Sequence, residues 1–216
     1  MPFGPVSEIG VDMSTQLLFV PSHAIQTKYH GVLFRSRIEA RWAVFYDALG
    51  IEWEYEKEGY QLPGNLGAYL PDFWIPSLSC WIEIKGANPS KAERDKCEAL
   101  ATITNHVVYL FYGKIPYPSP ESSESSEWIG PNGAWDCGYY WCQCQDCGKF
   151  GIEFNGRADR LPCKETFQTW EERTDKKIFL YEEGKCTRYG FNGDKGYNSS
   201  SEDLLRAYGA ASLARF

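Results

Sequence analysis

The chain has 216 residues, a formal net charge of −7 and a sequence pI near 5.1. This length is sufficient for one sizeable hydrophobic core and a small additional module. The acidic balance disfavours a generic nucleic-acid-binding protein held by a basic surface, and no apolar stretch approaches the length of a transmembrane helix.

The first strongly patterned segment, residues 35–49, is predicted to be a helix. Its apolar residues recur at the spacing of one helix face, namely Ile38, Trp42, Phe45 and Leu49. Ser36 is a suitable N-cap, and Gly50 stands where a helix should end. Residues 1–28 precede this region as an N-terminal extension with one short strand-like run, residues 16–20.

Three strands, a second helix and a fourth strand are predicted to follow. Each strand is a short run of alternating or continuous apolar residues, and the second helix opens at Asn88-Pro89-Ser90 and runs to about Ile103. The predicted strands are 51–56, 68–75, 80–85 and 106–112. The predicted order is therefore α-β-β-β-α-β, an α/β core within residues 29–115.

The remaining chain divides by composition into three parts. Residues 116–127 are rich in proline, serine and glutamate without an apolar period, which indicates a linker or mobile loop. Residues 128–198 hold most of the cysteines and are predicted to form a small module. Residues 199–216 are predicted to contain a C-terminal helix that packs on the core or on a partner, with an apolar stripe of Leu204, Leu205, Tyr208 and Leu213.

Three charged residues stand out within the predicted sheet. Asp72 follows Pro71 at the start of one strand-like run, and Glu83 and Lys85 lie two apart in the next. Residues at i and i+2 of a strand point to the same face, so a short turn would bring Asp72 beside the other two. Two carboxylates in an apolar sheet are costly to bury unless they have a purpose, such as holding a divalent cation. A hairpin with an ordinary surface ion pair is the alternative.

This pattern resembles the PD-(D/E)xK nuclease superfamily, whose core is the restriction-endonuclease-like fold. The resemblance rests on Pro71-Asp72, on Glu83-Ile84-Lys85 and on the element order, and it covers residues 29 to 113. It implies that Asp72, Glu83 and the carbonyl of Ile84 hold Mg²⁺ or Mn²⁺, and that Lys85 orients or activates the attacking water.

The family resemblance also implies an acid on the first helix, for which Glu39 is the candidate. The same glutamate completes a Ser36-x-x-Glu39 capping box, and one side chain could serve both roles. The nearby residues Arg35, Arg37 and Arg41 could contact phosphates. They could equally form a solvated helix face.

The eight cysteines form the second informative feature. Cys80 and Cys97 are isolated and are interpreted as small buried hydrophobes. Cys144-x-x-Cys147 followed by glycine is typical of a knuckle that presents two thiolates to one metal, and Cys163 follows at a suitable distance. These features predict a structural zinc site.

The fourth zinc ligand stays open among three cysteines. Cys142 is the nearest in sequence, whereas Cys137 and Cys186 are the alternatives. Disulfides are the competing interpretation, and an iron–sulfur cluster is a further rival. No basic segment followed by an apolar core marks a signal peptide at the N-terminus. A nuclease core implies the reducing cytoplasm of a bacterial or phage-infected cell, where clustered thiols bind metal.

The sequence therefore carries two hypotheses of different classes. The first is a metal-dependent nuclease acting on nucleic acid, with DNA as the expected substrate, in which the zinc module aids binding of substrate or partner. The second is a catalytically silent protein that keeps this fold and holds nucleic acid or a protein. A homodimer or another protein partner is compatible with both hypotheses, and no membrane association is expected.

Overall fold

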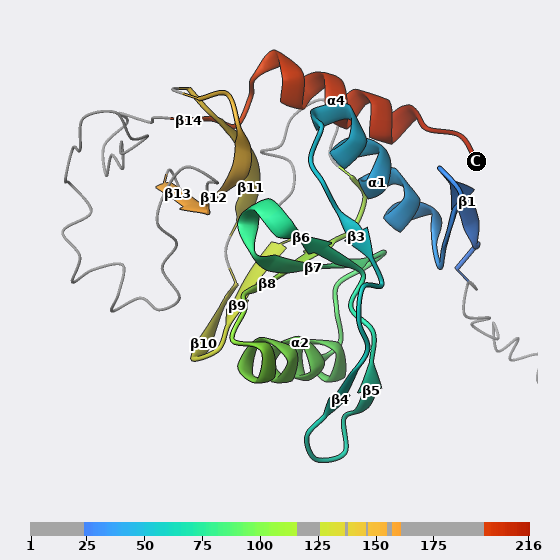
Figure 1. Ribbon diagram of the computed structural model, residues 1–216, viewed down its shortest axis with the longest axis vertical. Coiled ribbons are helices and arrows are strands. Elements are labelled where there is room, and N and C mark those ends of the chain that lie inside the picture. The colour runs from blue at the N-terminus through green and yellow to red at the C-terminus, as the bar shows by residue number, and fades with distance from the viewer. Residues whose placement is uncertain (1–23, 116–125, 137, 146, 155–156, 161–196) are drawn as a thin grey trace, which may run out of the picture.

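The structure is a computed structural model that describes residues 24–115, 126–136, 138–145, 147–154, 157–160 and 197–216 (Figure 1). It is a mixed α/β fold, built on a six-stranded sheet with the order β10-β9-β8-β7-β6-β3. These strands are β3 (Glu54–Tyr55), β6 (Phe73–Ile75), β7 (Cys80–Lys85), β8 (Val108–Tyr112), β9 (Ser126–Gly130) and β10 (Gly133–Asp136). Strands β7 and β8 are parallel, and the other neighbours are antiparallel.

Three α-helices occur in the described part of the chain: α1 (Arg37–Leu49), α2 (Lys91–Thr104) and α4 (Glu202–Leu213). Their ends follow the predicted signals. The Ser36 side chain accepts a hydrogen bond from the Glu39 amide, and Gly50 ends α1 in the left-handed conformation with φ of 64°. Ser90 opens α2 with a complete capping box. None of these helices is long and apolar enough to cross a bilayer.

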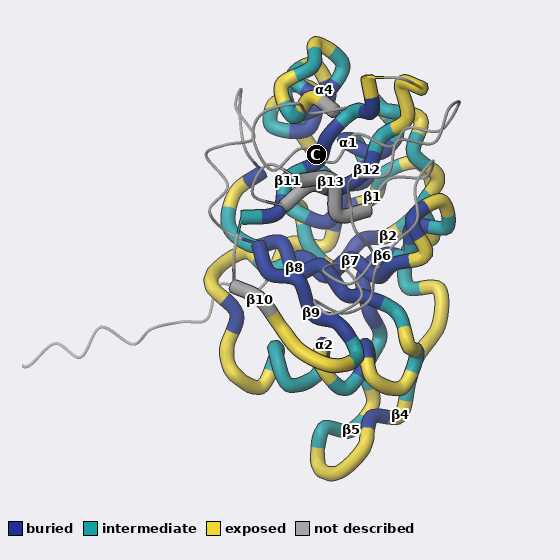
Figure 2. Tube along the Cα trace, turned by 90° about the vertical axis from the view of Figure 1, so that its left-hand side faces the viewer, coloured by how far each residue is buried: buried dark blue, intermediate teal, exposed yellow. Residues whose placement is uncertain are grey.

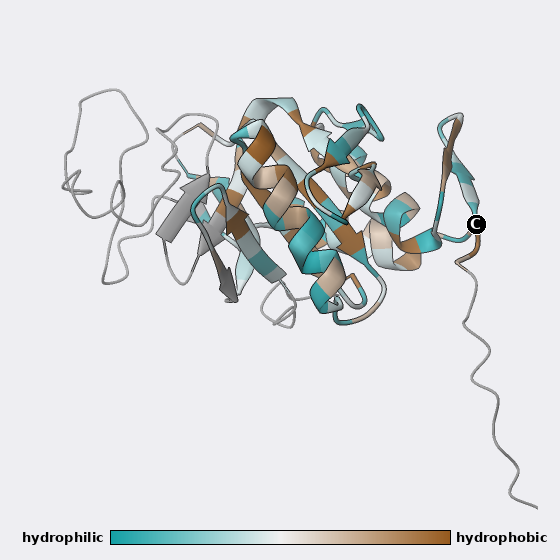
Figure 3. Cartoon of the chain, turned by 90° about the horizontal axis from the view of Figure 1, so that it is seen from below, coloured by the Kyte–Doolittle hydropathy of each residue, from teal (hydrophilic) through white to brown (hydrophobic). Residues whose placement is uncertain are grey.

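The two faces of the central sheet are covered by different helices. Helix α1, with α4 behind it, lies over one face, and α2 covers the other (Figure 1). The central strands run through the buried interior, whereas hydrophobic and hydrophilic residues alternate on the helices (Figures 2 and 3). In β7, Ile82 and Ile84 face the α1 side while Trp81 packs with the α2 side. The strand period therefore sends Glu83 and Lys85 toward α2.

The strand predicted over residues 68–75 is interrupted. Strand β5 (Gly67–Tyr69) pairs with β4 (Tyr60–Leu62) in a separate hairpin, and β6 begins only at Phe73. Pro71 lies in the break, where it has no amide hydrogen to give to a ladder. The run predicted over residues 51–56 contains only the two-residue strand β3. The α-β-β-β-α-β order is thus present within residues 37–112, with the β4–β5 hairpin added.

Residues 126–136 extend the central sheet. Strand β9 pairs antiparallel with β8, so the module boundary expected at residue 128 falls inside a strand of the core sheet. The next strands form a four-stranded sheet, β13-β12-β11-β14. They are β11 (Tyr139–Cys144), β12 (Phe150–Phe154), β13 (Arg157–Arg160) and β14 (Tyr197–Asn198).

This second sheet shares the main hydrophobic core. The Trp141 ring of β11 lies 5.7 Å from Phe45 and 5.5 Å from Tyr46 of α1, measured between ring centroids. The C-terminal helix packs in the same place, with Tyr208 4.5 Å from Phe45. Its apolar stripe is buried at Leu204 and Tyr208 but exposed at Leu213. A short hairpin of β1 (Thr27–Tyr29) and β2 (Val32–Phe34) precedes α1.

Candidate active site

The β6–β7 hairpin brings Asp72 and Glu83 into direct contact. A 3-10 turn, η1 (Pro76–Leu78), joins the strands, and Phe73 pairs with Ile82. The Asp72 amide donates to Glu83 Oε2 at 3.3 Å, and the Ile84 amide donates to Asp72 Oδ2 at 2.7 Å. The two acids therefore lie close together, as the sequence predicted. The backbone amide of Ile84, the middle residue of Glu83-Ile84-Lys85, holds the Asp72 carboxylate in place.

Two cations balance these acids. Lys85 Nζ lies 2.5 Å from Glu83 Oε1, as expected for side chains on one face of a strand. Arg35 Nη2 lies 2.5 Å from Asp72 Oδ1, and Arg35 Nε lies 2.8 Å from Glu56. The residues predicted from the Pro-Asp and Glu-x-Lys motifs therefore form one charge network.

Burial gives this network unusual electrostatics. Asp72 and Glu83 are each 1 % exposed. Burial and then the charges of Glu83 and Glu39 raise the pKa of Asp72 well above its ordinary value, against the opposing influence of Lys85 and Arg35. For Lys85, burial acts to lower the pKa, but the charges of Glu83 and Asp72 outweigh it and the pKa is raised. Ionisation of Asp72 therefore carries a cost that a divalent cation would relieve.

Asp72→Asn should raise the thermal unfolding midpoint of the metal-free protein. A carboxyl whose folded pKa is raised destabilises the fold at pH above its unfolded value, and the cost grows as pH rises toward the folded pKa. The gain should therefore be negligible near pH 4 and largest at neutral or higher pH, and Mg²⁺ should reduce it. Thermal melts across this pH range test the expectation, and an equal gain at every pH would contradict it.

Glu39 lies at the start of α1 and is engaged by local donors. Its Oε1 accepts from the Ser36 hydroxyl at 2.5 Å, and its Oε2 accepts from the Arg35 amide at 3.1 Å. The Tyr55 hydroxyl donates to the same Oε2 at 2.5 Å, a contact for which the sequence gives no local signal. Glu39 is also near enough to raise the pKa of Asp72. The expected capping box is formed only in part: Ser36 caps the Glu39 amide, but the Glu39 carboxylate accepts from the Arg35 amide in place of the Ser36 amide. A role at the helix start and a place beside the acids are both compatible with this geometry.

Glu39→Gln distinguishes these two roles. Glutamine retains an acceptor for the cap, so a capping residue should tolerate the change with a loss of about 1 kcal/mol or less in stability. A metal-binding residue should instead show weaker Mg²⁺ dependence of cleavage and a lower turnover rate. Magnesium titrations of the variant and the wild type, with melts alongside, provide the measurement. A normal magnesium titration would leave only the capping role.

Of the three predicted arginines, only Arg35 reaches the acids. Arg37 is exposed, and Arg41 has a buried Nε without a hydrogen-bond partner among the described residues. A neighbour that sequence reasoning missed is Tyr69, whose pKa is raised by burial and by the proximity of Cys97 and Glu83. Its position just before Leu70-Pro71-Asp72 is the signal that could have identified it.

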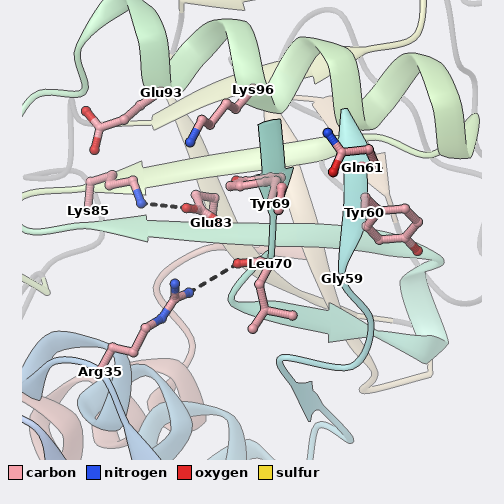
Figure 4. A pocket seen from close by; sticks show the side chains of 11 residues that line it. Arg35, Gly59, Tyr60, Gln61, Tyr69, Leu70, Glu83, Lys85, Glu93 and Lys96 are labelled. Atoms are coloured by element: carbon pink, nitrogen blue, oxygen red, sulfur yellow. Dashed lines mark hydrogen bonds and ion pairs between the residues drawn. The ribbon is translucent and has the colours of Figure 1, made fainter. Parts of the chain in front are cut away.

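The charge network opens into a cleft of about 660 Å³ between the β4–β5 hairpin, β7 and α2. Figure 4 shows Glu83 and Lys85 on β7, with Glu93 and Lys96 extending toward them from α2 and Arg35 approaching from the opposite side. The Lys85 side chain is 25 % exposed, whereas that of Glu83 is 2 % exposed. Glu83 therefore lies at the base of the cleft, and Asp72 lies next to it without lining the cleft. Arg35, Glu93 and Lys96 line the walls.

The donor set suits a magnesium or manganese ion without being a preformed cage. Within the described residues, no group of three or more His, Cys, Asp or Glu side chains is arranged to hold a metal. Asp72 and Glu83 nevertheless provide two adjacent carboxylates, and Ile84 adds a backbone carbonyl next to the amide that binds Asp72. Oxygen ligands of this kind, completed by water, are what Mg²⁺ prefers.

Only part of the predicted zinc site lies in the described residues. Cys144 is buried and Cys147 is exposed at the turn between β11 and β12. The Gly148 amide donates to the Cys144 carbonyl at 2.9 Å, the Cys144 amide donates to the Lys149 carbonyl at 2.8 Å, and Gly148 has φ of 72°. This is a tight turn closed by glycine, as the knuckle pattern predicts. Cys142 is buried on β11, and Cys137, Cys163 and Cys186 lie outside the described residues.

Comparison with known proteins adds no family to this picture. No protein-family model matches the chain, and neither the curated proteins nor the solved structures contain a match. The chemistry of the cleft is therefore inferred from its own residues.

Proposed function

We propose that the protein is a metal-dependent nuclease that hydrolyses phosphodiester bonds, with DNA as the expected substrate. The observation that supports this most strongly is the proximity of two buried acids, Asp72 and Glu83. The Asp72 amide donates to the Glu83 carboxylate, and Lys85 pairs with Glu83 in a cleft. Buried titratable groups with strongly perturbed pKa values concentrate at functional sites. A purely structural ion pair would not require a second buried acid.

The residues can be assigned roles in this reaction. Asp72, Glu83 and the Ile84 carbonyl would hold Mg²⁺ or Mn²⁺, which when bound supplies charge for the oxygens of the scissile phosphate. Lys85 is placed to donate a hydrogen bond to the attacking water or to a phosphate oxygen, because its ammonium lies at the exposed edge of the network. Arg35 joins Asp72 to Glu56 and keeps the carboxylate oriented.

The finer fold assignment belongs to the same proposal. The element order from α1 to β8 and the position of both motifs on one hairpin support a restriction-endonuclease-like core of the PD-(D/E)xK type. The glycine-closed turn at Cys144 and Cys147 supports a zinc site, completed by Cys163 and by a fourth cysteine. Reduced thiols suited to zinc are expected in a bacterial or phage-infected cytoplasm.

One observation favours the catalytically silent alternative. Each buried acid already has a cation at 2.5 Å, Arg35 for Asp72 and Lys85 for Glu83, so each has a counter-ion without metal. A protein that binds nucleic acid or a protein partner through the cleft could keep such a network for stability.

Divalent-metal-dependent cleavage separates the two functions. Protein freed of metal with a chelator is incubated with plasmid, single-stranded and duplex DNA and with RNA, with and without Mg²⁺ or Mn²⁺. A nuclease should cleave at least one substrate only when metal is present, and the Asp72→Ala variant should not. Binding without cleavage of any substrate under all metal conditions would establish the silent alternative.

A further inference from the structure

The cationic side chains of helix α2 differ in whether they form ion pairs within the protein. Lys91 lies 2.7 Å from Asp95, and Arg94 lies 2.6 Å from Glu127, so both are paired within the protein. Lys96 has no ion pair with any described residue, and its ammonium lies 5.9 Å from the centroid of the Tyr69 ring. Figure 4 shows it directed from α2 into the cleft toward Tyr69 and Glu83. A contact of this kind with an aromatic face is weak and leaves the ammonium able to bind an anion.

Lys96 lies where it could bind a phosphate of a ligand in the cleft. Three cations, Lys96, Lys85 and Arg35, line the cleft together with two acids. These acids are Glu83 and Glu93, so the charged lining is slightly net positive, although the chain as a whole carries a net charge of −7. Positive charge in a recess of an acidic protein attracts anions locally while the remaining surface repels them. Lys85 and Arg35 are held by the buried acids, so Lys96 is the cation that remains for a phosphate next to the one at Lys85.

The shape of the cleft limits which polynucleotide can supply these phosphates. Glu83 is 1 % exposed and lines the cleft, of which the β4–β5 hairpin forms one wall and α2 forms the other. The volume of about 660 Å³ is that of a pocket for a drug-sized molecule, which is comparable with one or two nucleotides. The cleft has room for one strand at the depth of Glu83, whereas a duplex would have to keep its paired second strand outside the cleft.

We propose that the cleft binds a single-stranded polynucleotide, with Lys96 holding the phosphate adjacent to the one at Lys85. The proposal rests on the nuclease function for the identity of the ligand and adds the strand form and a phosphate-binding residue. Lys96 is a positioning residue, because it fixes the strand without touching the acids. Single-stranded DNA and single-stranded RNA share this backbone chemistry, and separate arms of the binding experiment distinguish them.

Binding measured without cleavage tests the proposal. Fluorescence anisotropy of a short labelled oligonucleotide is followed in a chelating buffer, with single-stranded DNA, single-stranded RNA and duplex DNA of one sequence. We expect at least one of the single strands to bind at least about tenfold more tightly than the duplex. A tenfold difference in affinity corresponds to about 1.4 kcal/mol of binding free energy. Whichever of single-stranded DNA and single-stranded RNA binds more tightly identifies whether the preferred ligand carries deoxyribose or ribose. Duplex binding as tight as that of both single strands would overturn the proposal.

Substitutions then test Lys96 itself. Lys96→Gln should lower affinity for the single strand and reduce the slope of log affinity against log salt by about 0.7, the value for one phosphate contact on a single strand. Lys91→Gln, on the same helix and 87 % exposed, is the matched control and should change neither quantity. A folded Lys96→Gln protein that behaves like this control would overturn the assignment. If the wild-type protein binds the single strand but shows no metal-dependent cleavage, the nuclease function is refuted. The proposal that the cleft binds a single strand would still hold.

Discussion

Lys85→Ala should abolish magnesium-dependent cleavage while leaving a folded protein. Loss of one preorganised donor at a reacting phosphate costs about a hundredfold to a thousandfold in turnover. Lys85 is a donor in direct contact with one of the acids, 2.5 Å from Glu83, and it lines the cleft. The measurement is the initial rate of cleavage at saturating Mg²⁺, with thermal melts to confirm folding. Because Lys85 balances a buried carboxylate, we also expect a lower unfolding midpoint in the absence of metal.

Lys91→Ala is the control for this experiment. It removes the same side chain from an exposed position whose ion pair with Asp95 is of the kind that contributes little to stability. Asp72→Ala should match Lys85→Ala in lost turnover but should also weaken magnesium binding, which calorimetric titration can measure. Wild-type rates in folded Lys85→Ala protein would remove this residue from the mechanism.

The parts of the site that the sequence predicted are those controlled by local geometry. Glu83 and Lys85 share one face because strand residues alternate, and Asp72 meets them because a short turn joins β6 to β7. The helix ends at Ser36 and Gly50 follow from local capping chemistry. Each of these features depends on residues within about a dozen positions along the chain.

The parts that were missed depend on long-range partners. The contact of Arg35 with Asp72 and that of Glu39 with Tyr55 join residues far apart in the sequence, which the folded sheet brings together. The first two residues of β9, Ser126 and Glu127, were predicted to belong to the linker because they are polar, yet Glu127 is 4 % exposed. Arg94 of α2 provides the compensation with Nη2 at 2.6 Å from Glu127 Oε1, so a charged residue is buried in a core strand. No local pattern reveals such a pairing.

The region expected to be a separate zinc module is also partly built into this core. Trp141 packs on α1 three residues before Cys144, so a metal bound at the turn would be coupled to the main hydrophobic core. This coupling changes what cysteine substitutions should do. Loss of metal should lower the stability of the core itself as well as release the segment that carries the cysteines.

Cys147→Ser should therefore lose bound zinc and destabilise the whole protein. A structural zinc site contributes its binding free energy to folding, on the order of 10 kcal/mol in isolated zinc-binding peptides. Purified wild-type protein should carry about one zinc per chain, and both Cys147→Ser and Cys144→Ser should carry substantially less. Elemental analysis measures the metal, and thermal melts of the same samples should show a lower midpoint. Cys147 is the more decisive position because it is exposed, so serine there disturbs no packing.

Cys97→Ala is the control, since Cys97 is buried on α2, where its Sγ lies 3.5 Å from the Tyr69 hydroxyl, and it is not part of the turn. It should keep the zinc content of the wild type, as should Cys80→Ala. Parallel substitution of Cys142, Cys137 and Cys186 by serine should identify the fourth ligand as the one whose loss matches Cys147→Ser. Protein purified without chelator that contains no zinc, and whose C-terminal cysteines resist thiol labelling until reduced, would replace the metal site with disulfides. The same result would argue against a reducing compartment, because disulfides persist where the surroundings are oxidising.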